Sequence, residues 1–302
     1  MNEAGEMTIP VGYIGLGTMG EPMARNILAA GFSTWVYDVN ELAVARLVEA
    51  GATVAGSPRE LAANCRVVMV NVVNDAQVEQ VICAADTGLI DALGEGSVVV
   101  VHSTVHPDTC RRLAGEVAKR GVGLIDAPFT GGAAAAAAGT LSLLVGGKDW
   151  CVEKARPVLE AEGVITHLGD VGTGELAKLG NNLVIGITIH AVHEAIRLAV
   201  SAGLDSETML AVLTSGAADC WAARNWDSVG KMTAVYPGGA EGLAALTHKD
   251  LSLAMKVAQD HGVRLRITEQ AAMDLHEPYL SAFSRLSAKA DVPADRGGDV
   301  SG

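Results

Sequence analysis

Short apolar runs alternate with amphipathic segments through the first half of the chain. The runs are rich in Val and Ile and end at polar residues or glycines, as buried strands do. They predict strands at Val11–Ile14, Thr34–Tyr37, Val67–Asn71, Val98–Val101, Gly123–Asp126, Leu141–Val145 and Val164–His167. The segments between them have the helical period and predict helices at Met19–Ala30, Glu41–Ala50, Asp75–Ala84 and Pro107–Arg120. Such alternation predicts an α/β fold with a mostly parallel sheet.

The pattern changes at about Gly172, after which only helical periods remain. Gly174–Ala202 predicts one long helix whose middle is apolar on nearly every side, so we expect this helix to be buried. Helical periods continue from 206 to about 284, with breaks near 215–219 and 237–239. The second half of the chain is therefore expected to be all-helical.

These patterns divide the chain into three parts. An α/β domain is expected at 1–171 and a helical domain at 172–287, because 302 residues are more than one hydrophobic core usually supports. The remaining residues, 288–302, are rich in Asp, Gly, Ser and Pro and are expected to be disordered. Within the first domain, the run Ala133–Ala138 predicts a short helix or a flexible connector.

Composition and charge narrow the range of partners. Hydrophobic residues make up 49% of the chain and charged residues 19%, as in globular proteins. The formal net charge is -13 and no run is rich in Lys or Arg, so nucleic acid and anionic membrane surfaces are poor candidate partners. A local cation and backbone N–H groups can still hold a small anionic substrate.

The sequence predicts a cytoplasmic protein. The first ten residues, MNEAGEMTIP, lack the basic and apolar regions of a secretory signal. We find no apolar run as long as a membrane span, and the richest stretch, Leu183–Ile189, is a short piece of a longer helix. The five cysteines are odd in number, widely scattered and without a C-x-x-C pair, which favours reduced thiols over disulfides or a zinc site.

A glycine-rich motif follows the first predicted strand and opens the next helix. It consists of Gly15, Leu16, Gly17, Thr18, Met19 and Gly20, in the pattern G-x-G-x-x-G. Glycine is needed there for a tight turn, for close approach of the backbone to a pyrophosphate and for helix–strand packing. Asp38 ends the second strand, at the spacing of the acidic residue that binds the ribose. The motif predicts a dinucleotide-binding Rossmann domain, the alternative being a turn cluster with a chance surface Asp.

Asp38 also favours NAD over NADP as the cofactor. A carboxylate at this position accepts hydrogen bonds from the ribose hydroxyls of NAD and repels the 2′-phosphate of NADP. Proteins that bind NADP usually place Arg in this region, whereas here Val39 and Asn40 follow Asp38.

Polar residues after two strands are candidates for ligand binding, because ligands of open α/β sheets bind at the carboxyl ends of the strands. Thr104 follows the strand at 98–101 and is expected to contact the nicotinamide. Thr130, Gly131 and Gly132 follow the strand at 123–126, where a hydroxyl and backbone N–H groups suit a carboxylate. The alternative for this second segment is a loop that only turns away from the sheet.

Two further candidates lie on predicted helices. Lys178 and Asn182 are four residues apart and therefore share one face of the long helix. A Lys is usually solvated, but this helix becomes apolar one turn later, and buried polar side chains need partners or a function. Lys249 opens another helix, where alone it would be an ordinary charged helix start.

Together these residues resemble the β-hydroxyacid dehydrogenase family, which includes 3-hydroxyisobutyrate dehydrogenase and tartronate semialdehyde reductase. The resemblance extends from about Val11 to Leu280. Its motifs, in family order, are Gly15–Gly20, Asp126–Gly132, Gly139-Thr140-Leu141 with Gly146-Gly147, Lys178-x-x-x-Asn182 and Lys249-Asp250-Leu251. It implies a Rossmann domain, a long interdomain helix and a helical domain that forms homodimers or homotetramers.

The resemblance also implies a role for each candidate residue. Lys178 is the implied catalytic residue, Lys249 closes over the cofactor, and the substrate is bound by Thr130, Gly131, Gly132 and Asn182. The chain departs from the family at three places, which concern the identity of the substrate. Thr130 replaces the usual Ser, His102 precedes Ser103-Thr104 where Asp is frequent, and Val72-Val73 replace a Leu-Pro pair in the cofactor wall.

The implied reaction is reversible oxidation of a β-hydroxy acid to its semialdehyde or keto acid, with hydride passing to NAD. Lys178 would accept the hydroxyl proton, and burial beside a cationic nicotinamide is expected to lower its pKa from the ordinary value of about 10.4. Two alternatives stay open. An imine reductase commonly has another residue in place of Lys178, and a silent NAD-binding scaffold would not need Lys178, Asn182 and Thr130 together. A third candidate, 6-phosphogluconate dehydrogenase, shares motifs but has a much longer chain.

Other conspicuous residues are given structural interpretations. His190 and His193 have the spacing of metal ligands, but no third ligand is evident, so a hydrogen-bonded or interface histidine is the better interpretation. Trp221 and Trp226 are assigned to a core, a subunit interface or a substrate pocket. The cysteines are interpreted as small packing residues.

Overall fold

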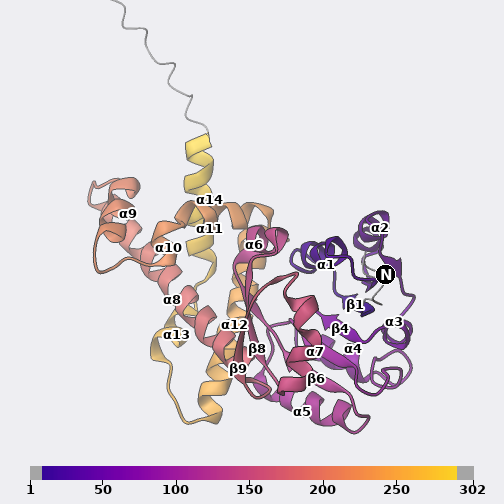
Figure 1. Cartoon of the computed structure of the whole chain (residues 1–302). Helices are drawn as coiled ribbons and strands as arrows, with labels where there is room; N and C mark the ends of the chain where they lie inside the picture. The colour runs from indigo at the N-terminus through magenta and orange to yellow at the C-terminus, as the bar shows by residue number, and fades with distance from the viewer. Residues whose placement is uncertain (1–8, 291–302) are drawn as a thin grey trace, which may run out of the picture. The chain divides into compact units, whose positions relative to one another are not determined.

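The computed structural model describes residues 9–290, and most of its helices and strands are labelled in Figure 1. The chain forms two compact units, the first ending at Gly180 and the second beginning at Asn181. The predicted disordered tail, 288–302, lies outside the described residues from 291 onward. The predicted domain boundary at 171 stays a prediction.

The first unit is built on a mostly parallel sheet, as predicted. Its strands within the described residues are β1 (Val11–Ile14), β2 (Thr34–Tyr37), β3 (Thr53–Val54), β4 (Val67–Val70), β5 (Val98–Val101), β6 (Gly123–Asp126), β7 (Phe129–Thr130), β8 (Leu141–Gly146) and β9 (Gly163–Gly169). They lie in the order β3-β2-β1-β4-β5-β6-β8-β7, with β9 beside β8. The ladder is parallel from β3 to β6, whereas β8 runs antiparallel to β6 and β7. This order brings the carboxyl ends of β1, β4 and β5 together, where doubly wound folds bind dinucleotides.

Helices cover both faces of this sheet. They are α1 (Gly20–Ala29), α2 (Glu41–Glu49), α3 (Pro58–Asn64), α4 (Asp75–Cys83), α5 (Pro107–Ala118), α6 (Gly132–Ala138) and α7 (Asp149–Leu159). Successive strand residues point to opposite faces, so Val98 and Val100 join one hydrophobic cluster and Val99 and Val101 join the other. The first cluster includes residues of α1, α2 and α7, and the second includes residues of α3, α4 and α5. The run Ala133–Ala138 belongs to α6, a short helix.

The second unit is helical throughout its described residues, as predicted. Its helices are α8 (Thr173–Ser201), which begins in the first unit, α9 (Ser206–Ser215), α10 (Trp221–Arg224), α11 (Trp226–Val235), α12 (Gly239–Asp260), α13 (Arg266–Ala271) and α14 (His276–Ala290). Its core contains Ile189, Val192, Trp226 and Tyr279. A Cβ on Gly230 of α11 would lie 2.5 Å from the Ala282 carbonyl oxygen, so glycine lets α11 and α14 approach closely.

The long helix α8 corrects two expectations. We expected it to be buried, but Val184, Leu198 and Val200 are 55%, 73% and 54% exposed within the single chain. We also found no apolar run as long as a membrane span, yet α8 is long and apolar enough to cross a membrane by length and composition alone. Ile189 and Val192 of this helix lie in the hydrophobic core of the second unit, as in a core helix of a soluble protein.

Candidate active site

The glycine-rich turn lies between β1 and α1 and has the shape that a pyrophosphate needs. Gly15 has φ +93°, and a Cβ there would lie 2.1 Å from the Asn71 carbonyl oxygen. A Cβ on Gly20 would lie 1.9 Å from the Gly15 carbonyl oxygen, whereas a Cβ on Gly17 would meet nothing within 4 Å. Gly15 and Gly20 are therefore required by the turn itself, while Gly17 leaves its outer side open. The residues present fit a dinucleotide at this turn.

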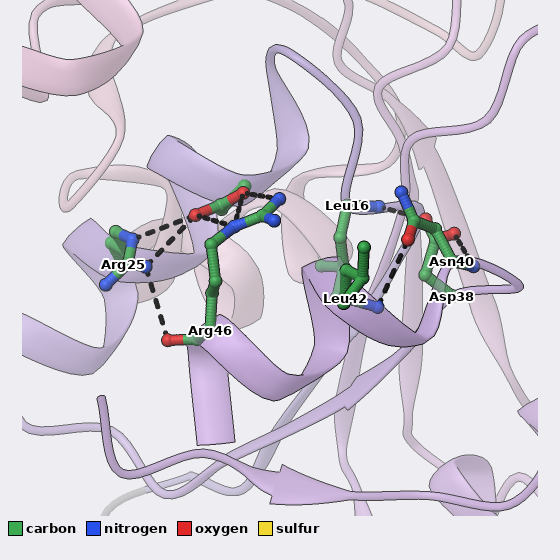
Figure 2. A network of polar contacts seen from close by, with 7 residues as sticks. Leu16, Arg25, Asp38, Asn40, Leu42 and Arg46 are labelled. Carbon is green, nitrogen blue, oxygen red and sulfur yellow. Dashed lines mark hydrogen bonds and ion pairs between the residues drawn. The ribbon is translucent and has the colours of Figure 1, made fainter. Parts of the chain in front are cut away.

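Asp38 is joined to the glycine-rich turn by hydrogen bonds. Its Oδ2 accepts from the backbone N–H of Leu16 at 2.5 Å, and its Oδ1 accepts from the backbone N–H of Asn40 at 2.7 Å (Figure 2). The two sequence signals for NAD, the turn and the carboxylate at the end of β2, are thus brought together.

An ion-pair network beside this carboxylate was not predicted from the sequence. Glu21 accepts hydrogen bonds from Arg46 at 2.6 Å and from Arg25 at 3.0 Å, and Arg25 also donates to the Arg46 carbonyl oxygen (Figure 2). The hydrogen bond from Arg46 is the largest cause that lowers the pKa of Glu21, so this carboxylate stays charged. Both guanidinium groups are paired with Glu21.

The predicted cofactor wall forms at the ends of β4 and β5. The backbone N–H of Val72 donates to Ser103 Oγ at 2.8 Å, and the backbone N–H of His102 donates to the Val70 carbonyl oxygen at 2.8 Å. These bonds hold Val72 beside Ser103, which directly precedes the half-buried Thr104. Three predicted cofactor contacts therefore lie together, beside the glycine-rich turn at the same edge of the sheet.

The substrate segment differs from the predicted loop in one respect. Thr130 ends a two-residue strand, β7, where it is paired with Ser142 of β8. Gly131 and Gly132 follow with φ +127° and +73°, conformations that favour glycine, and both are exposed. Lys178 Nζ donates to the Phe129 carbonyl oxygen at 2.7 Å. The structure thus brings Lys178 next to Thr130.

The first turn of α8 is anchored to the sheet by buried carboxylates. Asp126, at the end of β6, accepts from the backbone N–H groups of Gly172 at 2.7 Å and Glu175 at 2.8 Å. Burial raises the pKa of Asp126, although these N–H groups act in the opposite direction. Glu175 accepts from the backbone N–H of Val105 at 3.2 Å. Lys178 follows Glu175 by three residues, so its position is set by this anchor.

The second unit holds the remaining predicted site residues in one group. Asn182 Nδ2 donates to Asp250 Oδ2 at 2.7 Å, and Lys249 Nζ lies 2.9 Å from Asp250 Oδ1. Asp250 is buried, and its part in this group was not predicted from the sequence. Burial, followed by the charge of Asp250, raises the pKa of Tyr236. The Asp250 carboxylate thus orients the side chains of both Asn182 and Lys249.

The histidines, tryptophans and cysteines that were interpreted as structural residues differ in their surroundings. His193 is 3% exposed, and neither of its ring nitrogens forms a hydrogen bond within the described residues. Of its two interpretations, the hydrogen bond inside the chain is wrong, and the interface stays a prediction. Trp226 is buried in the core, while Trp221 is 44% exposed. All five cysteines are free thiols, and of these Cys83 is exposed and does not pack in a core.

Two family models match consecutive parts of the chain. Residues 10–169 match the NAD binding domain of 6-phosphogluconate dehydrogenase. Residues 172–290 match the NAD-binding model of NADP-dependent 3-hydroxyisobutyrate dehydrogenase.

Individual relatives cover most of the chain. A probable mitochondrial 3-hydroxyisobutyrate dehydrogenase of Dictyostelium discoideum is 35% identical over 94% of this chain and 88% of its own length. An NAD-dependent L-serine dehydrogenase of Pseudomonas aeruginosa is 36% identical over 82% of this chain and 85% of its own length. The structure of Mycobacterium tuberculosis 3-hydroxyisobutyrate dehydrogenase with L-serine has a TM-score of 0.80 at 28% identity, covering 93% of this chain and 99% of that one. A Streptomyces aurantiacus imine reductase, with a TM-score of 0.64 at 20% identity over 94% of this chain and 100% of its own, shares the fold alone.

Proposed function

Because the chain belongs to the 3-hydroxyisobutyrate dehydrogenase family, we propose that it reversibly oxidises a β-hydroxy acid to its semialdehyde or keto acid with NAD. The observation that carries this proposal is the position of Lys178. Its ammonium is held 2.7 Å from the Phe129 carbonyl oxygen, beside Thr130, on a helix whose first turn is anchored to the Rossmann sheet.

Lys178 is the proposed general acid and base. Bound NAD supplies the hydride acceptor at C4 of its nicotinamide ring. In oxidation, the Lys178 amine accepts the hydroxyl proton while the C–H bond releases its electron pair as hydride and the C=O bond forms. In reduction, the Lys178 ammonium returns that proton to the carbonyl oxygen. A single group within hydrogen-bond distance of the substrate oxygen serves both directions.

The substrate carboxylate is proposed to bind Thr130 and the backbone N–H groups of Gly131 and Gly132. The glycines are exposed, so their backbone is open to a small anion. Asn182, one turn beyond Lys178 on α8, is proposed to orient the substrate hydroxyl. The closure of Lys249 over the cofactor stays a prediction of the resemblance.

Loss of the Thr130 hydroxyl tests carboxylate capture. Thr130→Ala should raise the substrate KM by roughly 5- to 30-fold, which corresponds to about 1–2 kcal/mol for a hydrogen bond to a charged group. Thr130→Ser keeps the hydroxyl and is the matched control. Equal turnover of alcohols that lack an anionic group would contradict this assignment.

NAD is the proposed physiological cofactor, because Asp38 has the sequence spacing of the ribose-binding acidic residue and is hydrogen bonded to the glycine-rich turn. The nearby guanidinium groups of Arg25 and Arg46 are paired with Glu21. Among the alternatives, the imine reductase has no support beyond the shared fold. A silent NAD-binding scaffold would not need an anchored Lys178. We also propose a cytoplasmic location, as favoured by five free thiols, and a homodimer or homotetramer that covers the exposed apolar side chains of α8.

Absorbance at the NADH band tests the reaction directly. The protein is incubated with NAD or NADP and either 3-hydroxyisobutyrate or L-serine, the compounds that the relatives suggest. We expect NADH to form with at least one of them and to form more slowly with NADP. Absence of turnover with a panel of β-hydroxy acids, in both directions, would contradict the proposed function.

A further inference from the structure

His102 and Glu162 form a buried pair beneath the candidate active site. His102 follows β5 and precedes Ser103-Thr104, and Glu162 lies between α7 and β9. The His102 Nε2 and Glu162 Oε2 atoms are 3.1 Å apart, and both side chains are completely buried. Among residues 9–290, no other group donates a hydrogen bond to the Glu162 carboxylate. A buried carboxylate is costly without a partner, so the pair must hold a proton between its members.

The second ring nitrogen of His102 fixes where the protons lie. Nδ1 is 2.7 Å from the Ala127 carbonyl oxygen, and a carbonyl only accepts, so Nδ1 carries a hydrogen. Nε2 and the Glu162 carboxyl then share one further proton. Burial lowers the pKa of His102, but the charge and hydrogen bond of Glu162, together with the Ala127 carbonyl, raise it above the ordinary value. The raised pKa of His102 favours the imidazolium and carboxylate form of this pair.

Aromatic rings enclose the His102 ring on two sides. The Tyr13 ring of β1 is stacked on it at 6.4 Å, and the Phe129 ring of β7 meets it edge-on at 5.9 Å. Burial, followed by the charge of Glu162, raises the pKa of the Tyr13 phenol, which therefore stays neutral. The charged group that faces His102 from these packed elements is thus Glu162.

These contacts connect the buried pair to the candidate catalytic group. His102 bonds the Ala127 carbonyl and packs on Phe129, and the Phe129 carbonyl accepts from Lys178 Nζ. On the other side, His102 directly precedes the Ser103-Thr104 end of β5. We propose that His102, paired with Glu162, is a positioning residue that fixes residues 127–130, and through them Lys178, relative to the nicotinamide edge of the sheet. This inference rests on the proposed function for its kinetic consequence and on geometry alone for the pair itself.

Kinetic comparison of paired variants separates positioning from stability. His102→Leu removes the link, and His102→Leu with Glu162→Leu also removes the unpaired buried carboxylate, a replacement that is often neutral or stabilising. Glu162→Gln keeps the link, because its amide can donate to a neutral His102 ring. His167→Leu is the matched control, because His167 also bonds a backbone carbonyl, that of Gly147 at 2.8 Å, elsewhere in the same sheet.

We expect His102→Leu to lower kcat for 3-hydroxyisobutyrate about 10- to 100-fold, as a misplaced reacting group does, with little change in the Kd for NAD. The double Leu variant should regain thermal stability but not kcat, while Glu162→Gln and His167→Leu should keep kcat close to wild type. A double variant that regains kcat together with stability would overturn the inference, and so would a folded His102→Leu protein with wild-type kcat. If His102→Leu does not fold, the double variant alone decides between these outcomes.

Nitrogen-15 spectra of labelled histidines test the pair without any turnover. The His102 ring, identified by its absence in the double Leu variant, should carry hydrogens on both nitrogens at pH 8 in the wild type. It should be neutral at that pH in Glu162→Gln. A neutral His102 ring in the wild type at pH 7 would overturn the ion pair. Lack of activity with every substrate would contradict only the proposed function, because these spectra would still report on the pair.

Discussion

At the scale of single residues, Asp38 determines the predicted choice of cofactor. Its carboxylate is held by the backbone N–H groups of Leu16 and Asn40, so it cannot turn away from a ribose 2′-phosphate without breaking those bonds. We expect a higher kcat/KM with NAD than with NADP, and Asp38→Ala should reduce this preference mainly by weakening NAD. Initial rates with both cofactors measure it. A wild-type preference for NADP would contradict the assignment.

Site residues that belong to a motif with fixed spacing could be predicted from the sequence. Residues that pair with a partner far away in the sequence could not. Gly15–Gly20, Asp38 and Lys178 belong to motifs with fixed spacing. Glu162 has no such signal, because its partner His102 is 60 residues away in the sequence and the two meet only through the sheet. The one available signal was the unusual His102 itself, a titratable residue at the end of an apolar strand.

Among the helices and strands, segments with a clear period were predicted, whereas two short strands and two helices were missed. The strands β3 and β7 have two residues each, too few to show alternation. Helix α7 contains Pro157, which obscures its pattern. Helix α3 was missed although Ser57 and Glu60 have the spacing of a capping box at its start. In the structure, Ser57 accepts from the Glu60 backbone N–H and Glu60 accepts from the Gly56 N–H.

Asp126 should connect the sheet to the helix that carries Lys178. Asp126→Ala leaves the buried N–H groups of Gly172 and Glu175 without their acceptor, which should lower the free energy of unfolding by about 1–3 kcal/mol. It should also lower kcat, because Lys178 follows the loosened turn. Asp126→Asn keeps one oxygen acceptor and should be intermediate. Urea unfolding and steady-state rates measure both effects, and unchanged values for Asp126→Ala would refute the anchor.

For the whole molecule, the hydrophobic pattern along the chain was enough to predict an α/β part followed by an all-helical part. What it could not predict is which apolar surface stays exposed in a single chain, as Leu198 and Val200 of α8 do. A helical period identifies apolar positions but not the neighbour that covers them. Burial on α8 therefore depends on contacts that no local pattern encodes.

His193 should make the second unit sensitive to acid. Burial lowers its pKa, as do the charges of Arg197 and His190, against the opposite effects of Glu277 and Asp274. The unfolded chain, with His near its ordinary pKa of about 6.5, therefore binds a proton before the folded one does. The contribution of the neutral His193 to the free energy of unfolding is fully present above about pH 6.5, and it is lost as the pH falls toward the pKa of His193 in the folded protein. Urea midpoints at pH 7.5 and 5.5 should differ less in His193→Phe than in wild type, and equal differences would exclude this role.

Lys178 is proposed to transfer the substrate proton, and the kinetics of Lys178 variants test this role. Lys178→Met should bind NAD nearly as wild type does, while its turnover should fall at least the ~10²–10⁴-fold typical of lost acid–base catalysis. Lys178→Arg should also fail, because a guanidinium does not release its proton in this range. The exposed Lys148→Met is the control. Oxidation by the wild type should rise with pH along a limb that the Lys178 variants lack. A Lys178→Met enzyme within a few-fold of wild-type turnover, with a deuterium isotope effect showing that hydride transfer limits the rate, would contradict this role of Lys178.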